Sequence, residues 1–280
     1  MGEVFLAHDR LLDRDVVLKR LRTSNITSSR ALEREAASMA QINHQNVAIV
    51  HSLAFFDSTP VVVQEYLPGG TLQDRLGGSG ALVSAEFLNL VQGLCDGLGA
   101  LHARGYVHRD VKPSNIGYGV TNTPKLIDFG LAQLFRVGRG LNSSETPWEL
   151  EGAMETGDSV FNGGLAGTPL YMSPEALRTE EPNASFDVWS VSVVIFEALT
   201  GKHPFRSNSG AETNRSIIRC LDGVWRKALT DVFEDNVPVA VEEIFSSCFH
   251  PEHSQRPQQI EHLAEIIASF SPSDLAHRHL

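Results

Sequence analysis

HRDVKPSN, residues 108–115, is the most informative stretch of the sequence. It follows a predicted helix and a short apolar pair, so we expect a loop in which a rigid scaffold holds side chains over a cleft. Asp110 could accept a proton from a hydroxyl, Lys112 could offset charge on a phosphoryl group, and Asn115 could supply an oxygen ligand to Mg²⁺. One loop therefore offers three of the groups that phosphoryl transfer needs.

A second stretch, KLIDFG at residues 125–130, follows closely. It reads as an apolar strand that ends at Asp128 and is followed by Gly130, which lets the chain turn. An aspartate at such a strand end is well placed to hold a hard cation between phosphate oxygens. Alone the tripeptide Asp-Phe-Gly is weak evidence, but directly after HRDVKPSN it is strong evidence for a nucleotide-dependent enzyme.

The two motifs together resemble the catalytic domain of eukaryotic-type Ser/Thr protein kinases, including the bacterial members, and the resemblance covers residues 2–265. It implies an α+β, bilobal protein kinase-like fold: a small antiparallel sheet lobe with one helix, and a larger helical lobe. The whole chain, 1–280, would be a single catalytic domain with an N-lobe at 1–66 and a C-lobe at 67–280. The implied function is ATP-dependent transfer of the γ-phosphoryl group to protein Ser/Thr hydroxyls, with autophosphorylation of the activation loop.

The resemblance also implies a role for each catalytic residue. Asp110 corresponds to the catalytic base, and Lys112 to the lysine of Ser/Thr rather than Tyr specificity. Asn115 and Asp128 correspond to the two residues that bind Mg²⁺ or Mn²⁺. ATP and a divalent metal ion are therefore the expected cofactors.

Lys19 of VVLK corresponds to the lysine that grips the α- and β-phosphates of ATP. Its expected ion-pair partner is Glu35, because Glu35 shares a helical face with Met39 and Ile42; Glu33 is the competing candidate. Gln64 and the residues after it correspond to the gatekeeper and hinge that meet the adenine. The other implied nucleotide-binding residues are Val4, Val17, Gln64, Glu65 and Leu67.

GTPLYMSPEAL, residues 167–177, resembles the segment that receives the substrate peptide, and it places Thr168 near the catalytic loop. Glu175 should pair with Arg256 deep in the helical lobe. Asp187 resembles the aspartate that braces the catalytic-loop backbone. These residues are thus expected to support substrate docking and the fold.

Arg109, beside Asp110, suggests regulation, because a phosphate added between residues 131 and 167 could settle its charge and order that loop. The residues between 132 and 166 have weak periodicity, so a long loop is expected there. The candidate acceptors are Ser143, Ser144, Thr146, Thr156 and Ser159. The sequence does not rank them.

The chain opens with MGEVFLAHD, which keeps only Gly2 and Val4 of the glycine-rich pattern G-x-G-x-x-G-x-V. We expect a further strand and turn upstream, and poor ATP binding by the chain as it stands. One alternative is therefore a pseudokinase that acts as a scaffold. A small-molecule kinase of the aminoglycoside type is another, although Lys112 and the peptide-docking segment oppose it.

The bulk properties set the remaining expectations. With 280 residues, 42% hydrophobic, and a net charge of −11, the chain should be a folded globular protein without broad attraction to nucleic acid or anionic membranes. Three dispersed cysteines and a start without a secretory signal indicate the cytoplasm. The apolar run at 187–201 contains Glu197 and predicts a buried core helix, not a membrane span. The protein partner would be a Ser/Thr-containing substrate, and the oligomeric state stays open.

Local patterns predict several elements. Strand-like runs occupy residues 3–9, 14–21, 47–56 and 60–67, and a helical pattern occupies 28–42. A further helix should begin with Ser84 as its N-cap and stop at Gly105. A small sheet with one helix, followed by a helix-rich part, is the expected order.

Overall fold

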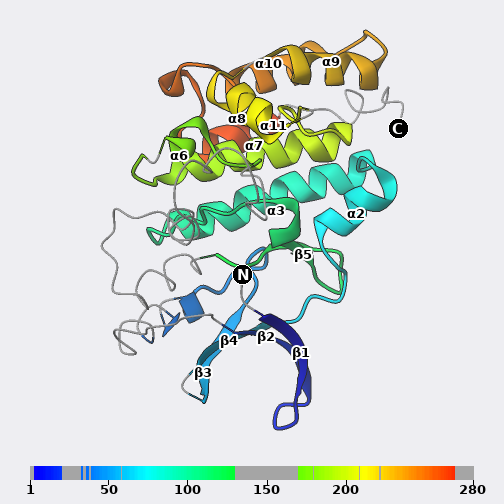
Figure 1. Ribbon diagram of the computed structural model, residues 1–280. Coiled ribbons are helices and arrows are strands. Elements are labelled where there is room, and N and C mark those ends of the chain that lie inside the picture. The colour runs from blue at the N-terminus through cyan, green and yellow to red at the C-terminus, as the bar shows by residue number, and fades with distance from the viewer. Residues whose placement is uncertain are drawn as a thin grey trace.

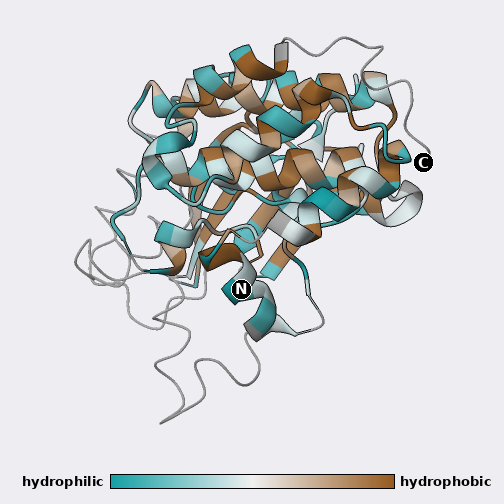
Figure 2. Cartoon of the chain, turned by 90° about the horizontal axis from the view of Figure 1, so that it is seen from above, coloured by the Kyte–Doolittle hydropathy of each residue, from teal (hydrophilic) through white to brown (hydrophobic). Residues whose placement is uncertain are grey.

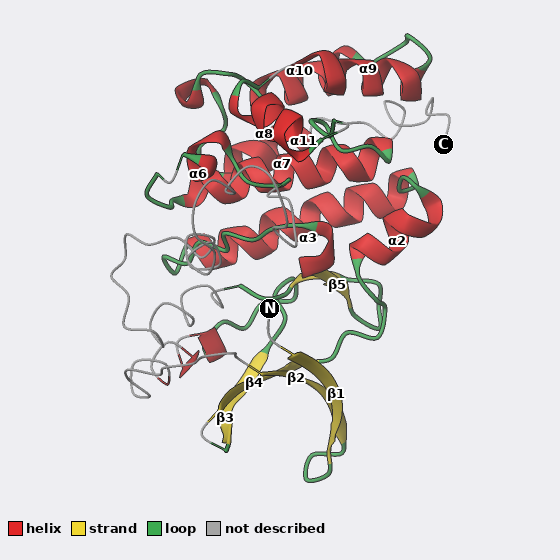
Figure 3. Ribbon diagram, in the orientation of Figure 1, coloured by secondary structure: helices red, strands yellow, loops and turns green. Residues whose placement is uncertain are grey.

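The computed structural model describes residues 3–20, 33, 36–37, 39–57, 59–129, 170–178, 180–207, 209–220 and 222–268. Figure 1 shows a curved sheet at one end of the molecule and a larger body of helices at the other. The separation is plain in Figure 3, where the long strands all lie in one lobe. The expected α+β, bilobal arrangement is therefore observed.

The sheet lobe contains four antiparallel strands in the spatial order β1-β2-β4-β3. Their bounds are β1 Glu3–Asp9, β2 Arg14–Arg20, β3 Val50–Phe56 and β4 Thr59–Glu65. Valine is frequent in β2 and β4, and its β-branched side chain favours extended backbone. All four strands were predicted from the sequence, with ends that differ by up to three residues.

The strand register decides which side chains share a face. Lys19 lies opposite Val4 on β1 and opposite Val62 on β4, and Val17 lies opposite Gln64. Directly opposed residues of an antiparallel pair project to the same face, and so do residues two apart along a strand. Val4, Val17, Lys19 and Gln64 therefore form one strip on a single face of the sheet.

The link between the lobes is bonded to the helical body. The Gly69 amide donates to the Tyr118 carbonyl at 2.9 Å, and the Tyr118 amide donates to the Gly70 carbonyl at 3.0 Å. A Cβ on Gly69 would lie 2.8 Å from Cβ of Tyr118, so only glycine permits this approach. Helix α2, Leu72–Ser79, then begins with a capping box between Thr71 and Asp74.

The helical lobe is built around α3, Ser84–His102, and α7, Ala184–Thr200. The other helices are α6 Pro174–Leu177, α8 Gly210–Ile218, α9 Asp222–Phe233, α10 Val239–Cys248 and α11 Ile260–Ala268, with 3₁₀ turns at Pro113–Asn115 and His253–Gln255. Figure 2 shows hydrophobic residues recurring along these helices between hydrophilic ones. Strands β5, Ile116–Tyr118, and β6, Pro124–Leu126, form a small ladder where the lobes meet.

Helix α7 is the apolar run that the sequence predicts to be a core helix, and this prediction is confirmed. Nearly all of its residues are buried, and Glu197 is one of the few that are partly exposed. Among the described residues, the structure contains no helix that is both long enough and apolar enough to cross a bilayer.

The predicted N-cap of α3 was wrong by one position. Ser84 is the first helical residue, and Val83 occupies the N-cap without a side-chain hydrogen bond. Serine is favoured at this end of a helix in general, so local preference located the helix start but not the capping residue.

Aromatic packing joins α7 to the helices beyond it. Trp189 stacks on Phe205 with ring centroids 5.5 Å apart, and Phe196 meets Phe245 edge-on at 4.9 Å. Phe249 contacts Phe205 at 5.0 Å between centroids. Burial of such rings contributes strongly to core stability, so α7 is a rigid support for the segments that are hydrogen-bonded to it.

Candidate active site

Asp187, in the first turn of α7, supports the loop at residues 108–115. Its carboxylate accepts the backbone amides of His108 at 2.7 Å and Arg109 at 2.8 Å, and lies 2.8 Å from Nε2 of His102. The Asp187 side chain has no exposed surface. The loop backbone is thus held by a buried carboxylate on a rigid helix, which is the bracing geometry that the sequence suggests.

The same loop contains a strained backbone conformation, which the hydrogen bonds to Asp187 can stabilise. Arg109 has φ of 68°, in the left-handed region that side chains other than glycine rarely adopt. Burial lowers the pKa of His108, so its ring stays neutral: Nε2 donates to the Ile127 carbonyl at 3.0 Å and Nδ1 faces the Asp110 amide at 3.4 Å. His108 therefore ties the loop to the segment that carries Asp128.

Asp110 projects from this loop with half of its side chain exposed. Lys112 donates to both carboxylate oxygens, at 2.8 and 2.6 Å, and the Asn115 amide nitrogen donates to Oδ2 at 2.7 Å and to the Asp110 carbonyl at 2.8 Å. With its NH₂ group used in this way, Asn115 has its amide oxygen as the remaining polar atom. The structure thus joins the three residues of the predicted catalytic set.

The β5–β6 ladder brings Asn115 and Asp128 together. Ile116 pairs with Leu126, and the Ile127 amide donates to the Asn115 carbonyl at 2.9 Å. Asn115, directly before β5, and Asp128, two residues after β6, therefore lie at the same end of the ladder. Asp128 has φ of 65°, another left-handed conformation outside glycine. A carboxylate and an amide oxygen are ligands that suit Mg²⁺ or Mn²⁺, so the donor set fits the expected metal.

Lys19 reaches this edge from the sheet lobe. Its ammonium contacts the Asp128 carboxylate, which joins the two lobes at one ion pair. Burial lowers the pKa of Lys19 to about 8, because desolvation disfavours the charged ammonium. A partly desolvated cation beside the Asp128 carboxylate is well suited to contact phosphate oxygens.

The strip on the sheet continues away from Lys19 toward the interlobe link. Gln64 is 3% exposed, whereas Val4 is 62% exposed. Leu67, after the end of β4, packs on the β5 backbone, because a Cβ on Gly117 would lie 2.5 Å from Cδ1 of Leu67. The strip and Leu67 thus border the junction of the two lobes from the sheet side and from the link.

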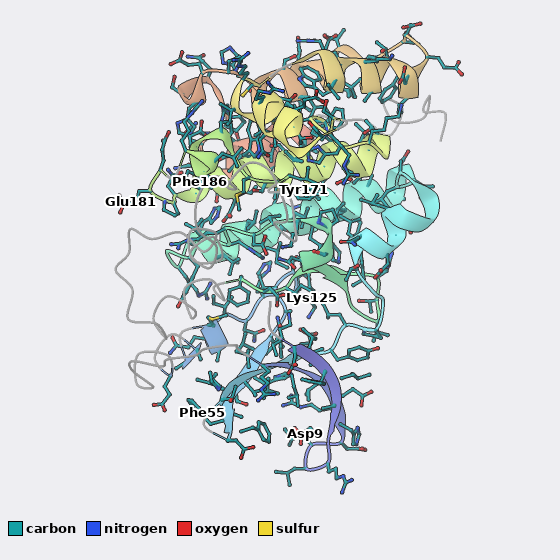
Figure 4. The ribbon with its side chains drawn as sticks, in the orientation of Figure 1. Asp9, Phe55, Lys125, Tyr171, Glu181 and Phe186 are labelled. Carbon is teal, nitrogen blue, oxygen red and sulfur yellow. The ribbon has the colours of Figure 1, made fainter. Side chains whose placement is uncertain are left out.

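Glu65 holds the link by its side chain. Its carboxylate accepts Lys125 Nζ at 2.7 and 2.9 Å and the Ile49 amide at 3.0 Å. Figure 4 shows Lys125 where the sheet lobe and the helical body meet. No role for Lys125 was predicted from the sequence; its place as a lysine inside the apolar strand β6 was the signal that could have indicated one.

The peptide-docking candidate ends in a buried ion pair. Arg256 donates to both carboxylate oxygens of Glu175, at 3.1 and 2.9 Å, and both side chains are 5% exposed. Ser173 caps α6 by accepting the Ala176 amide at 3.0 Å. The first residues of α6 are therefore fixed from both the backbone and the side chain.

Some predicted site residues lie outside the described part of the chain. These are Glu35, Thr168, Gly130 and the five candidate phosphate acceptors, Ser143, Ser144, Thr146, Thr156 and Ser159. Glu33, the competing partner of Lys19, is exposed. The pairing of Lys19 with Glu35 therefore stays a prediction.

Two lobes are joined by a hydrogen-bonded link, and Lys19 contacts Asp128 across their junction, which is the arrangement expected for a protein kinase fold. The chain belongs to the protein kinase domain family, whose model matches residues 1–267. The predicted resemblance is confirmed by this match.

Bacterial Ser/Thr kinases are among the similar sequences. The chain is 32% identical over 217 residues to the serine/threonine-protein kinase PknB of Mycobacterium tuberculosis, covering 75% of this chain and 32% of the relative. It is 30% identical over 212 residues to PrkC of Bacillus subtilis, covering 75% of this chain and 30% of the relative. The chain thus spans about a third of the length of these relatives.

A solved structure supports the fold independently. The crystal structure of Rad53 1–466 in complex with AMP-PNP aligns with a TM-score of 0.71 at 19% identity, covering 99% of this chain and 61% of that chain. At this identity the likeness establishes the fold, in agreement with the expected bilobal architecture.

Proposed function

We propose that this chain is a Ser/Thr protein kinase that transfers the γ-phosphoryl group of ATP to hydroxyls of protein substrates. The observation that carries the proposal is the continuity of the site across both lobes. Lys19 contacts Asp128, Asp128 lies at the same end of the β5–β6 ladder as Asn115, and Asn115 is hydrogen-bonded to Asp110. The groups proposed to contact the phosphates, the metal ion and the acceptor hydroxyl are thereby linked by successive contacts.

Each residue has a role in this proposal. Asp110 accepts the proton of the acceptor hydroxyl, and Lys112, which already bonds Asp110, stabilises negative charge on the transferred group. Asn115 and Asp128 would hold Mg²⁺ or Mn²⁺, which supplies charge neutralisation at the phosphates. Lys19 would bind the α- and β-phosphates, so the protein contributes mainly positioning and electrostatic stabilisation.

The nucleotide base would lie against the strip at the lobe junction. We infer that Val4 and Val17 face the adenine, that Gln64 is the gatekeeper, and that backbone groups from Glu65 to Leu67 bond its edge. The shared sheet face of Val4, Val17 and Gln64 supports this assignment. We further propose that the chain is one catalytic domain, divided near residue 67, and that its need for ATP places it in the cytoplasm.

Regulation through Arg109 remains part of the proposal. Its strained backbone is fixed next to Asp110, so an anion bound by its guanidinium would act beside the catalytic base. We propose that autophosphorylation between residues 131 and 167 supplies this anion. Phosphatase treatment should then lower the activity, and unchanged activity would remove the idea.

The test of the proposed function is transfer of radiolabelled γ-phosphate from Mg-ATP to casein, to a basic protein, and to a panel of sugars and aminoglycosides. Asp110→Ala should lower the transfer rate to protein by about 10²- to 10⁴-fold, the usual contribution of a general base. Asp231→Asn, an exposed aspartate of α9 that pairs with Lys202, is the matched control and should transfer at the wild-type rate.

The same assay separates the alternatives. Labelling of a small molecule but of no protein would show a small-molecule kinase. Binding of a fluorescent ATP analogue without labelling of any acceptor, including the chain itself, would favour the scaffold reading.

A further inference from the structure

Two consecutive carbonyls of the proposed peptide-docking segment are held by side chains of the α7 region. The Leu170 carbonyl lies 2.9 Å from Nε2 of His203, and the Tyr171 carbonyl accepts the Ser190 hydroxyl at 2.7 Å. His203 and Ser190 are both 5% exposed. Figure 4 places Tyr171 within the helical body, away from the sheet.

The two hydrogen bonds differ in how firmly they hold the segment. Ser190 has one hydroxyl proton, and its oxygen also lies 3.0 Å from the Phe186 carbonyl of its own helix, so that proton has two acceptors. His203 has a single arrangement. Its Nδ1 faces the Phe205 amide at 3.1 Å and must accept that proton, so Nε2 carries the hydrogen that is donated to Leu170.

The His203 ring is held rigidly in this orientation. It follows Gly201, the left-handed C-cap of α7, and precedes Phe205, which stacks on Trp189 at 5.5 Å. The ring meets Tyr171 edge-on, with centroids 5.4 Å apart, and the Tyr171 hydroxyl donates to Glu197 at 2.5 Å. Burial, with a smaller effect from Arg206, lowers the pKa of His203 to about 4, so the ring is neutral near pH 7.

The hydrogen bond from His203 to Leu170 lies in the segment proposed to receive the peptide, so its loss should affect peptide binding. Leu170 is two residues after Thr168, and the far end of the same segment is fixed by the Glu175–Arg256 pair. The described part of the segment, residues 170–177, is thus held by His203 at Leu170 and by Arg256 at Glu175. Freeing the Leu170 end would let the backbone that receives the peptide adopt several conformations, which weakens binding of a peptide but not of a nucleotide.

We propose that His203 is a positioning residue for the peptide substrate, because its Nε2 hydrogen bond to the Leu170 carbonyl sets the backbone of the docking segment. The inference rests on the proposed kinase function and adds a specific determinant of peptide affinity. His203 itself need not touch the peptide or ATP, since it acts through the segment that it holds.

The test compares His203→Leu, which removes the hydrogen bond, with His203→Gln, whose amide can still donate from the Nε2 position. In steady-state kinetics with a casein-derived Ser peptide, His203→Leu should raise KM for the peptide about tenfold, with KM for ATP and ATP hydrolysis without peptide within about twofold of the wild type. His203→Gln should return the peptide KM to within about threefold of the wild type.

His253→Leu is the matched control, because His253 also makes a histidine hydrogen bond in the helical lobe, 3.0 Å to the Ser185 hydroxyl, but away from Leu170. It should leave the peptide KM unchanged. If His203→Leu leaves the peptide KM within twofold, or raises the KM values for peptide and ATP equally, the inference is wrong.

Fluorescence anisotropy of the labelled casein peptide measures peptide binding directly, so the inference about His203 can be tested separately from the proposed kinase function. If the wild type binds the peptide but transfers no phosphate, the proposed function fails, and the inference still requires about tenfold weaker peptide binding by His203→Leu. A wild type that neither binds the peptide nor phosphorylates it would overturn both.

Discussion

The two lobes hold their parts of the site by different means. In the helical lobe, single buried polar side chains do this: Asp187 holds two loop amides, and Arg256 holds Glu175. In the sheet lobe, the positions of Val4 and Lys19 follow from the strand ladder, in which backbone hydrogen bonds set the register. The loop at residues 108–115 therefore depends on a few tertiary contacts, whereas the strip of Val4, Val17, Lys19 and Gln64 depends on a repetitive backbone pattern.

This difference predicts different sensitivities to mutation. A buried charge that loses its partner keeps its full desolvation cost, so single substitutions behind the catalytic loop should be severe. A side chain on a half-exposed strand can be shortened while the ladder remains, so substitutions there should be mild.

The largest expected effect is the loss of the buried ion pair. Arg256→Met should lower the free energy of unfolding by about 3–5 kcal/mol, because the Glu175 carboxylate stays buried without its partner. Arg178→Met is the matched control: Arg178 lies 3.9 Å from the same carboxylate but its side chain is 49% exposed, so a change of about 0–1 kcal/mol is expected. Urea denaturation at pH 7 measures both, and equal effects would contradict the contrast between buried and exposed partners.

An intermediate effect is expected from the pH dependence of His203. Its pKa is about 4 in the folded chain against 6.5 ordinarily, so between these values the unfolded chain binds more protons and stability falls as the pH falls. Lowering the pH from 7 to 5 should cost about 2 kcal/mol through this residue.

His203→Gln should lose that part of the slope. His108, whose pKa burial also lowers, remains in both proteins, so the difference between wild type and variant isolates His203. Thermal unfolding of both proteins at several pH values from 7 to 5 is the measurement, and parallel curves would show that His203 is not protected from protonation.

The smallest expected effects test the sheet lobe with two adjacent residues on opposite faces of β1. Val4 shares the face of Lys19 and Phe5 does not; they are 62% and 49% exposed. Each alanine variant should change stability by less than about 1 kcal/mol. Val4→Ala should weaken binding of a fluorescent ATP analogue about three- to fivefold through lost apolar contact, and Phe5→Ala should leave it unchanged. Equal effects on the analogue would mean that this face does not meet the nucleotide.

Local sequence patterns predicted much of the fold and of the candidate site. The strands were predicted within a few residues because alternation and valine content are visible in short windows. Asp110, Asn115 and Asp128 were found through motif spacing. The N-cap of α3 was missed by one residue, because capping depends on backbone angles that neighbouring residues share, and Lys125 was missed because its partner Glu65 lies 60 residues earlier in the chain.

The sequence by itself therefore determined the family and the order of strands and helices, and it predicted the candidate reactive groups, since each depends on residues close together in the chain. Only the tertiary structure decided that Lys19 meets Asp128, that Asp187 holds the catalytic-loop amides, and that His203 holds Leu170. The partners in these contacts lie 109, 79 and 33 residues apart, and they meet through packing of the two lobes against each other and of the helical lobe around α7. Such contacts depend on the combined burial of many side chains, which no short window of sequence contains.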